Sequence, residues 1–148
     1  MSASPPPLTG LSFLARGRQF RAVAIPLEDV VNGQPNWPKY FLLTHSVELA
    51  IRAYLAFHKE SGASQPAGRA PKGHDLVGLY DLAMRCGLER NELVVAKLPY
   101  ISDLHETHYA RYPQPVSAVT LISYYDDLAD QLFADVADAI RPAPYIRV

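Results

Sequence analysis

Little in this sequence of 148 residues points to a disulfide-bonded, secreted or membrane protein. Cys86 is the only cysteine, which excludes an intramolecular disulfide and a cluster of thiolate metal ligands. We expect Cys86 to be a buried, unreactive thiol, because it lies among the apolar residues of a predicted helix. The first residues have no basic residue ahead of an apolar run, as a signal peptide would, and no stretch has the roughly 18 consecutive apolar residues of a membrane span. The expected location is the cytoplasm.

The sequence also has almost no net charge. Its 14 Lys and Arg residues against 15 Asp and Glu residues give a net charge of −1. No overall field therefore draws the protein to nucleic acid or to an anionic membrane, there is no signal for DNA binding, and any contact with RNA must use a local patch. A Gly-rich phosphate loop and a Gly-x-Ser-x-Gly nucleophile elbow are also missing from the sequence, and no cofactor is indicated.

What the sequence does have is helical periodicity. It is strongest from Lys39 to Glu60, where apolar residues recur at spacings of three and four. Further helices are expected over Leu8 to Val23, from His74 or Asp75 to Gly87, over Glu89 to Tyr112 with a break or kink at Pro99, and over Ser117 to Ile140. The side chains expected to face inward are Leu11, Phe13, Leu14, Phe20 and Val23 in the first helix, Leu43, Val47, Ala50, Tyr54 and Phe57 in the second, Leu76, Leu79, Leu82, Ala83 and Cys86 in the third, Leu93, Ala96, Ile101 and Leu104 in the fourth, and Leu121, Tyr125, Leu128, Leu132 and Val136 in the last.

The segments between these helices are rich in Pro and Gly. Pro26 to Pro38 contains Asn32-Gly33 and is expected to be a connecting loop with turns, and Ser61 to Gly73 a second loop. Strand structure is expected to be marginal, at most over Arg21 to Ile25. Four to five antiparallel helices joined by short loops predict an all-α, up-and-down bundle, in a single domain over residues 1–148 with residues 1–7 as a flexible tail.

Several polar residues of the Lys39 to Glu60 helix are candidates for a site. His45, Glu48 and Arg52 share one face, opposite the apolar stripe, and Glu48 precedes Arg52 by four residues, the favourable order for an ion pair. This stripe is either a solvated or inter-helix ion network, or part of a functional cleft or dimer interface. His74 and Asp75 stand at a predicted helix start, where Asp75 would cap the backbone N–H groups.

Arg111 is the best single candidate for a functional residue. Its guanidinium, near the start of the last predicted helix, would join the positive end of that helix in attracting a phosphate or carboxylate. Pairing with Asp103 or Glu106 is an equally good interpretation. Tyr112 is a candidate stacking platform for a base, or else a core residue.

His105 and His108 are three residues apart with Glu106 between them. Histidines spaced in this way can share a metal ion, but the metalloprotease pattern requires a spacing of four with Glu next to the first His. No metal site is assigned from the sequence.

Three short motifs in a fixed order resemble the HEPN family of bacterial and archaeal helical domains. The first, Leu43 to Leu55, contains His45, two further residues, Glu48-Leu49 and a basic residue, here Arg52, where the family has Lys. The second is Gly73-His74-Asp75-Leu76, and the third is Arg111-Tyr112-Pro113 before the last helix. The motifs span roughly Leu43 to Pro113, and the last helix fits by position only.

The resemblance implies a helical bundle that commonly dimerises, with roles in RNA cleavage, in toxin–antitoxin and phage-defence systems, or as a partner of nucleotidyltransferases. Catalytic members place an Arg four to six residues before a His near the start of the last helix. Here no His follows His108, so Arg111 lacks that partner. We therefore expect a non-catalytic binding or regulatory module, a homodimer that contacts RNA, a nucleotide, or a nucleotidyltransferase or antitoxin partner. The alternative is a metal-independent ribonuclease whose His is His45, His74 or His108.

Overall fold

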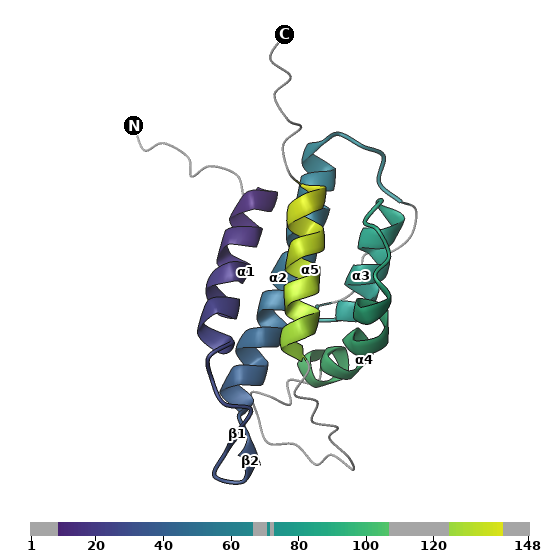
Figure 1. The fold of residues 1–148 in the computed structure, drawn as a ribbon. Helices are drawn as coiled ribbons and strands as arrows, with labels where there is room; N and C mark the ends of the chain where they lie inside the picture. The colour runs from purple at the N-terminus through teal and green to yellow at the C-terminus, as the bar shows by residue number, and fades with distance from the viewer. Residues whose placement is uncertain (1–8, 67–70, 72, 107–124, 141–148) are drawn as a thin grey trace, which may run out of the picture.

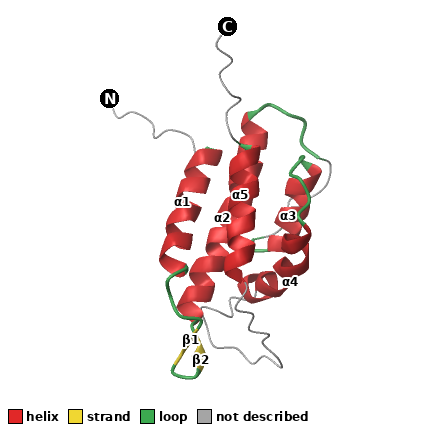
Figure 2. Cartoon of the chain, viewed as in Figure 1, coloured by secondary structure: helices red, strands yellow, loops and turns green. Residues whose placement is uncertain are grey.

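The computed structural model describes residues 9–66, 71, 73–106 and 125–140 of the chain. Within these ranges the chain forms five α-helices and one small hairpin, as Figures 1 and 2 show. The elements in order are α1 (Gly10–Ala24), β1 (Val30–Val31), β2 (Gln34–Pro35), α2 (Trp37–Glu60), α3 (Leu76–Arg85), α4 (Glu92–Glu106) and α5 (Tyr125–Ala139). The all-α class predicted from the sequence is confirmed.

Helix α2 is the centre of the fold and contacts each of the other four helices. Its start is set by Asn36, whose side chain accepts a hydrogen bond from Lys39 N at 3.3 Å, and by Pro38 in the first turn. Four of its five predicted core residues are buried, and Phe57 is partly buried against the core. None of the helices in the described ranges is long and apolar enough to cross a bilayer.

Helix α1 lies antiparallel to α2, and only part of the face predicted for it is buried: Leu14 is in the core, and Phe13 is partly buried against it. Leu11 and Val23 are 62% and 57% exposed, so their assignment to the core was wrong. The contacts of α1 also use small residues: a Cβ atom on Gly10 would lie 2.7 Å from Ala53 O of α2, and one on Gly17 would lie 3.2 Å from Leu49 Cβ of α2 and 2.9 Å from the Phe133 ring of α5. The pattern of large apolar residues does not predict these contacts, because glycine permits the close approach of two helices but carries no hydrophobic signal.

The loop predicted over Pro26 to Pro38 contains the hairpin of β1 and β2. Asn32 and Gly33 form its turn with φ angles of 53° and 73°, which matches the positive-φ pair of a two-residue hairpin turn. The base of the hairpin is fixed by Lys39, whose buried ammonium group contacts Asp29 at 2.8 Å and Asp126 of α5 at 3.3 Å. Burial lowers the pKa of Lys39, but these two carboxylates outweigh it and raise the pKa above its usual value. Strand structure in the described residues is limited to this hairpin, so the expectation of marginal strand is confirmed, whereas the one candidate segment, Arg21 to Ile25, is helical as far as Ala24.

Helix α3 begins and ends as predicted. Asp75 is its N-cap and accepts a hydrogen bond from Gly78 N at 3.0 Å, while Gly87 follows its end with a φ of 115°. Leu76, Leu79 and Ala83 are buried, and Leu82 is only partly buried. Cys86 is also partly buried, and this burial raises the pKa of its thiol.

Helix α4 is continuous through Pro99, so the predicted break does not occur. Leu93 and Ala96 are exposed, which makes their predicted inward orientation wrong, whereas Ile101 is buried as expected. The side chain of Leu104 lies outside the described part. The buried side chains in the described part of α4 are Val94, Leu98, Ile101, Ser102 and His105, which follow the helical repeat and share only Ile101 with the predicted set.

Helix α5 supplies the remaining face of the core. Leu128, Leu132 and Val136 are each fully buried, as the sequence predicts. The predicted start of this helix at Ser117, and the side chains of Leu121 and Tyr125, lie outside the described residues. Figure 1 shows α5 between α1 and the pair formed by α3 and α4, with α2 behind it.

Candidate functional site

Three polar side chains from three parts of the chain meet around Glu48. Helix α2 contributes Glu48 and Arg52, the segment before α3 contributes His74, and α4 contributes His105. We call these four residues the Glu48 network. The start of α3 is held beside α4 because Ser102 Oγ accepts hydrogen bonds from the backbone N–H groups of Leu76 and Val77, at 3.0 and 3.3 Å.

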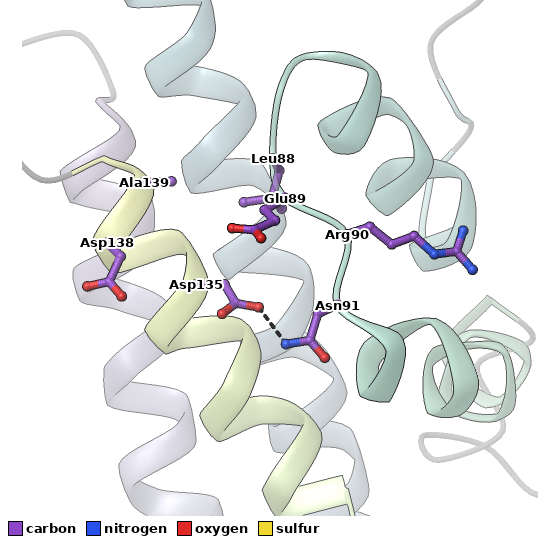
Figure 3. Close-up of a pocket in the computed structure, with 7 residues that line it drawn as sticks. All are labelled: Leu88, Glu89, Arg90, Asn91, Asp135, Asp138 and Ala139. Carbon is purple, nitrogen blue, oxygen red and sulfur yellow. Dashed lines mark hydrogen bonds between the residues drawn. The ribbon is translucent and has the colours of Figure 1, made fainter.

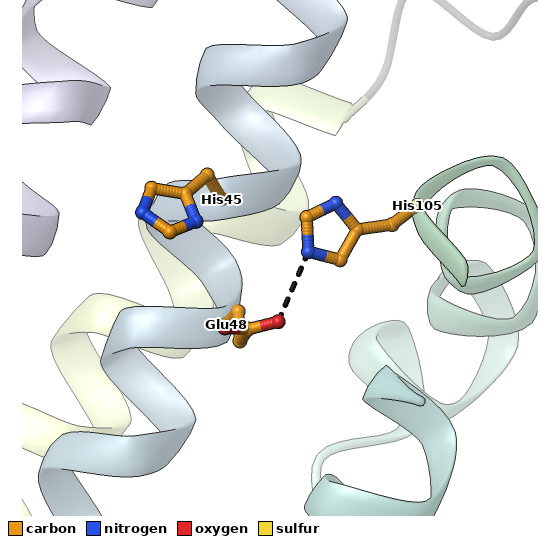
Figure 4. Close-up of side chains that lie close together, drawn as sticks. All are labelled: His45, Glu48 and His105. Carbon is orange, nitrogen blue, oxygen red and sulfur yellow. Dashed lines mark hydrogen bonds and ion pairs between the residues drawn. The ribbon is translucent and has the colours of Figure 1, made fainter. Parts of the chain in front are cut away.

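The two carboxylate oxygens of Glu48 divide these contacts. Oε1 lies 2.7 Å from His74 Nδ1 and 3.0 Å from His105 Nε2, and Oε2 accepts a hydrogen bond from Arg52 Nε at 3.2 Å. The contact with His105 is drawn in Figure 4. Arg52 also donates from Nη2 to Gly73 O at 3.0 Å. The network thus connects α2 directly to the segment that precedes α3.

Glu48 is ionised although only 5% of its surface is exposed. Burial raises the pKa of this carboxyl, but hydrogen bonds from His105 and His74 and the positive charge of Arg52 outweigh burial and bring the pKa to about 2. An ionised carboxylate can only accept hydrogen bonds. His74 must therefore carry its proton on Nδ1, and His105 must carry one on Nε2.

His45 lies beside this network, one turn before Glu48 on α2. Its ring is 4.7 Å from the Phe20 ring in an edge-to-face arrangement and 6.1 Å from the parallel Phe41 ring. The rings of His45 and His105 are 6.4 Å apart, and those of His74 and His105 are 4.8 Å apart. Three imidazoles thus gather around one buried carboxylate.

The sequence-predicted candidates divide into three groups. The first group comes together as an inter-helix network and consists of His45, Glu48, Arg52 and His74. The prediction that this polar face lies opposite the core was wrong for Glu48, which is buried. Asp75 acts as the N-cap of α3. The remaining candidates, Arg111 and Tyr112, lie outside the described residues, as does His108.

His105 is the member of the site that sequence reasoning missed. It was considered only as a neighbour of His108, whereas the structure places it 57 residues from its partner Glu48, with 3% of its surface exposed. One signal was present: His105 continues the buried phase of α4 set by Leu98 and Ile101, and a histidine on an apolar face needs a polar partner there.

A hollow of about 420 Å³ lies elsewhere, between α5 and the segment that joins α3 to α4 (Figure 3). Its lining residues are Leu88, Glu89, Arg90, Asn91, Asp135, Asp138 and Ala139. Asn91 Nδ2 donates to Asp135 Oδ2 at 3.0 Å, and Asn91 Oδ1 accepts from Leu93 N at 3.0 Å. Asn91 therefore caps α4 and ties it to α5, which gives Asp135 a structural role.

Comparison with known proteins found no matching family model, no similar curated protein and no similar solved structure. The basis for a function is therefore the Glu48 network together with the motifs of the sequence. The two share Glu48 and Arg52 of α2 and His74 of the segment before α3.

Proposed function

We propose that this chain is a HEPN-like binding module that contacts the phosphate groups of RNA or of a nucleotide without cleaving them. The observation that supports this proposal is the contact between the first two motifs of the resemblance. Glu48 of the first motif bonds His74 of the second, and Arg52 of the first bonds the carbonyl of Gly73. Motif residues that are distant in sequence but joined in space are expected of one functional unit.

Arg52 is the described residue best suited to contact a phosphate. Its side chain is 36% exposed, and its two hydrogen bonds use two of the five N–H donors of a guanidinium. Glu48 and Gly73 hold the group in place, so it loses less conformational entropy when it binds an anion. His74, with its side chain 34% exposed, adds a second polar group that bonds the other oxygen of Glu48.

The group that catalytic HEPN domains use for cleavage is missing from this sequence. Attack by a 2′-hydroxyl needs a base to take its proton and an acid for the leaving oxygen. The sequence has no His after Arg111 to supply that group. Of the two imidazoles bonded to Glu48, that of His105 is buried, whereas His74 is partly exposed and its second ring nitrogen is the candidate base of the ribonuclease alternative. Because the usual His is missing, we propose binding without cleavage.

An RNA-binding measurement tests this proposal. Labelled single-stranded RNA should bind weakly, and Arg52→Ala should both weaken binding and reduce the slope of log affinity against log salt by about 0.7, the value for one lost phosphate contact. Fluorescence anisotropy at several salt concentrations measures both quantities. The matched control is Arg85→Ala, because Arg85 also pairs with an acidic residue four positions earlier, Asp81, at 3.2 Å. This control should leave the affinity unchanged.

The same protein should not cleave RNA. Without metal, the wild-type chain and an Arg111→Ala variant should give indistinguishable amounts of product on a denaturing gel. Equal loss of binding in the Arg52→Ala and Arg85→Ala variants would contradict a specific phosphate site. Robust cleavage that is lost with Arg111→Ala and with His45→Ala or His74→Ala would favour the ribonuclease alternative.

We also propose that the chain forms a homodimer, as the resemblance implies, and that this homodimer binds a nucleotidyltransferase or antitoxin partner. Because Glu48 is turned into the protein, the dimer cannot use the whole His45, Glu48 and Arg52 stripe as its interface. Light scattering should give twice the chain mass of 16.4 kDa at micromolar concentrations. A monomer mass at high micromolar concentration, independent of salt, would end this part of the proposal.

A further inference from the structure

We propose that His45, Glu48 and His105 form a binding site for one divalent transition metal ion. This goes beyond phosphate binding and does not depend on it. Each of the three residues offers one ligand atom, and these atoms all lie within 4.8 Å of one another. Two imidazoles and one carboxylate are the ligand set of many catalytic zinc sites and of non-haem iron sites. Figure 4 shows the three side chains close together, two from α2 and one from α4, with the contact between Glu48 and His105 dashed.

The distances are close to those that an ion requires. Two ligand atoms of a tetrahedral zinc site, each about 2.0 Å from the metal, lie about 3.3 Å apart. His105 Nε2 and Glu48 Oε1 are 3.0 Å apart, so they need to separate by only about 0.3 Å. The widest separation, within 4.8 Å, needs to shorten by no more than about 1.5 Å. His45 is only partly buried, and rotation of its side chain can supply that shift.

The carboxylate ligand is already oriented by groups outside the proposed coordination shell. His74 Nδ1 bonds the same oxygen that faces His105, and Arg52 Nε bonds the other oxygen. Partners of this kind fix ligand geometry in metal sites and commonly change metal affinity by roughly 10–100-fold when they are removed. The burial of Glu48 and His105, 5% and 3% exposed, also limits competition by bulk water.

The ion would take the place of the proton that His105 now shares with Glu48. His105 Nε2 coordinates a metal only through its lone pair, so this nitrogen must first release its proton to solvent or pass it to Nδ1. Glu48 is already ionised and needs no such change. Three protein ligands leave a fourth position of a tetrahedral ion for water or another small ligand.

Zinc titration of the untagged full chain, in competition with a chromophoric chelator, tests the site. We expect one Zn²⁺ per chain, and an affinity at least about tenfold weaker in the His45→Ala and His105→Gln variants. His105→Gln keeps an N–H donor near Glu48 while removing the imidazole. The matched control is His58→Ala, since His58 lies 13 residues after His45 on the same helix, about 20 Å along its axis. This control should bind zinc as the wild type does.

Cobalt provides a second readout, because the visible spectrum of Co²⁺ changes with its coordination number and ligands. Wild-type protein and the His58→Ala variant should give the same four-coordinate spectrum, and His45→Ala should lose it while its circular dichroism stays native. The proposal is overturned if no ion binds, if His45→Ala binds zinc within about twofold of wild type, or if His58→Ala abolishes binding. RNA is not needed for any of these measurements, so failure here is distinct from failure of the phosphate site.

Discussion

Replacing Val47 with aspartate should unfold the domain at room temperature. Val47 is fully buried in the middle of α2, where the new carboxylate would have neither water nor a cation beside it. An unpaired buried charge, added to the lost apolar contacts, costs on the order of 5 kcal/mol or more, and a typical domain has only about 5–15 kcal/mol of stability. Circular dichroism and urea unfolding measure the loss. Leu128→Asp in α5 should have the same effect.

The control is the same substitution at an exposed valine. Val77 is 41% exposed in the first turn of α3, where an acidic side chain is favoured by the helix dipole. Val77→Asp should change the free energy of unfolding by no more than about 0.5 kcal/mol. Similar urea midpoints for Val47→Asp and Val77→Asp would contradict the position of α2 at the centre of the core.

The second large effect should come from acid. The pKa of Glu48 is about 2 in the folded protein, below its ordinary value of 4.5. A lowered folded-state pKa means that the contribution of Glu48 to stability is complete above about pH 4.5 and is lost as the pH falls toward 2. With an allowance for solvent screening of its partners, this contribution is roughly 2–3 kcal/mol. Acid should therefore loosen the junction of α2, α3 and α4.

A Glu48→Gln variant separates this effect from that of other carboxylates. The amide keeps the shape and one acceptor oxygen but has no charge to lose, so the variant should be less stable at neutral pH and should lose less stability between about pH 5 and pH 3. Urea unfolding at both pH values gives the four free energies. Glu92→Gln is the matched control, because Glu92 is exposed and paired with Arg90 at 2.7 Å. An unchanged pH dependence in Glu48→Gln would show that the network does not stabilise the ionised carboxyl.

The fold could be predicted from the sequence where the signals were local. The apolar repeat from Lys39 to Glu60 located α2 to within two residues at its start, and Asp75 marked the start of α3 through capping chemistry. The inward faces of α1 and α4 could be predicted only in part, since Leu14 and Ile101 are buried as expected whereas Leu11, Val23, Leu93 and Ala96 are exposed. In α1 the contact depends on Gly10 and Gly17, and in α4 apolar residues lie on both faces, so the sequence does not fix which face is buried.

The candidate site, too, could be predicted only where its contacts are local to one helix. The spacing of Glu48 and Arg52 on one helix predicts their pairing, and the structure has it at 3.2 Å. The contact of Glu48 with His105 is not predictable from spacing, because it depends on how α4 packs against α2. The sequence therefore placed Glu48 only on the polar face opposite the apolar stripe of its helix. Its burial is possible only because side chains from three segments satisfy its charge, and one of these segments was assigned in the wrong phase.

The hairpin of β1 and β2 is a suitable site for inserting a peptide tag. Among the helices and strands, β1 and β2 contact only each other, and Figure 1 shows them projecting beyond the ends of α1 and α2. A side-chain atom added at Gly33 would meet nothing within 4 Å. Exposed turns of this kind accept inserted peptides at little thermodynamic cost. A short tag between Asn32 and Gly33 would anchor the protein to a sensor surface and leave its histidines and both chain ends unmodified.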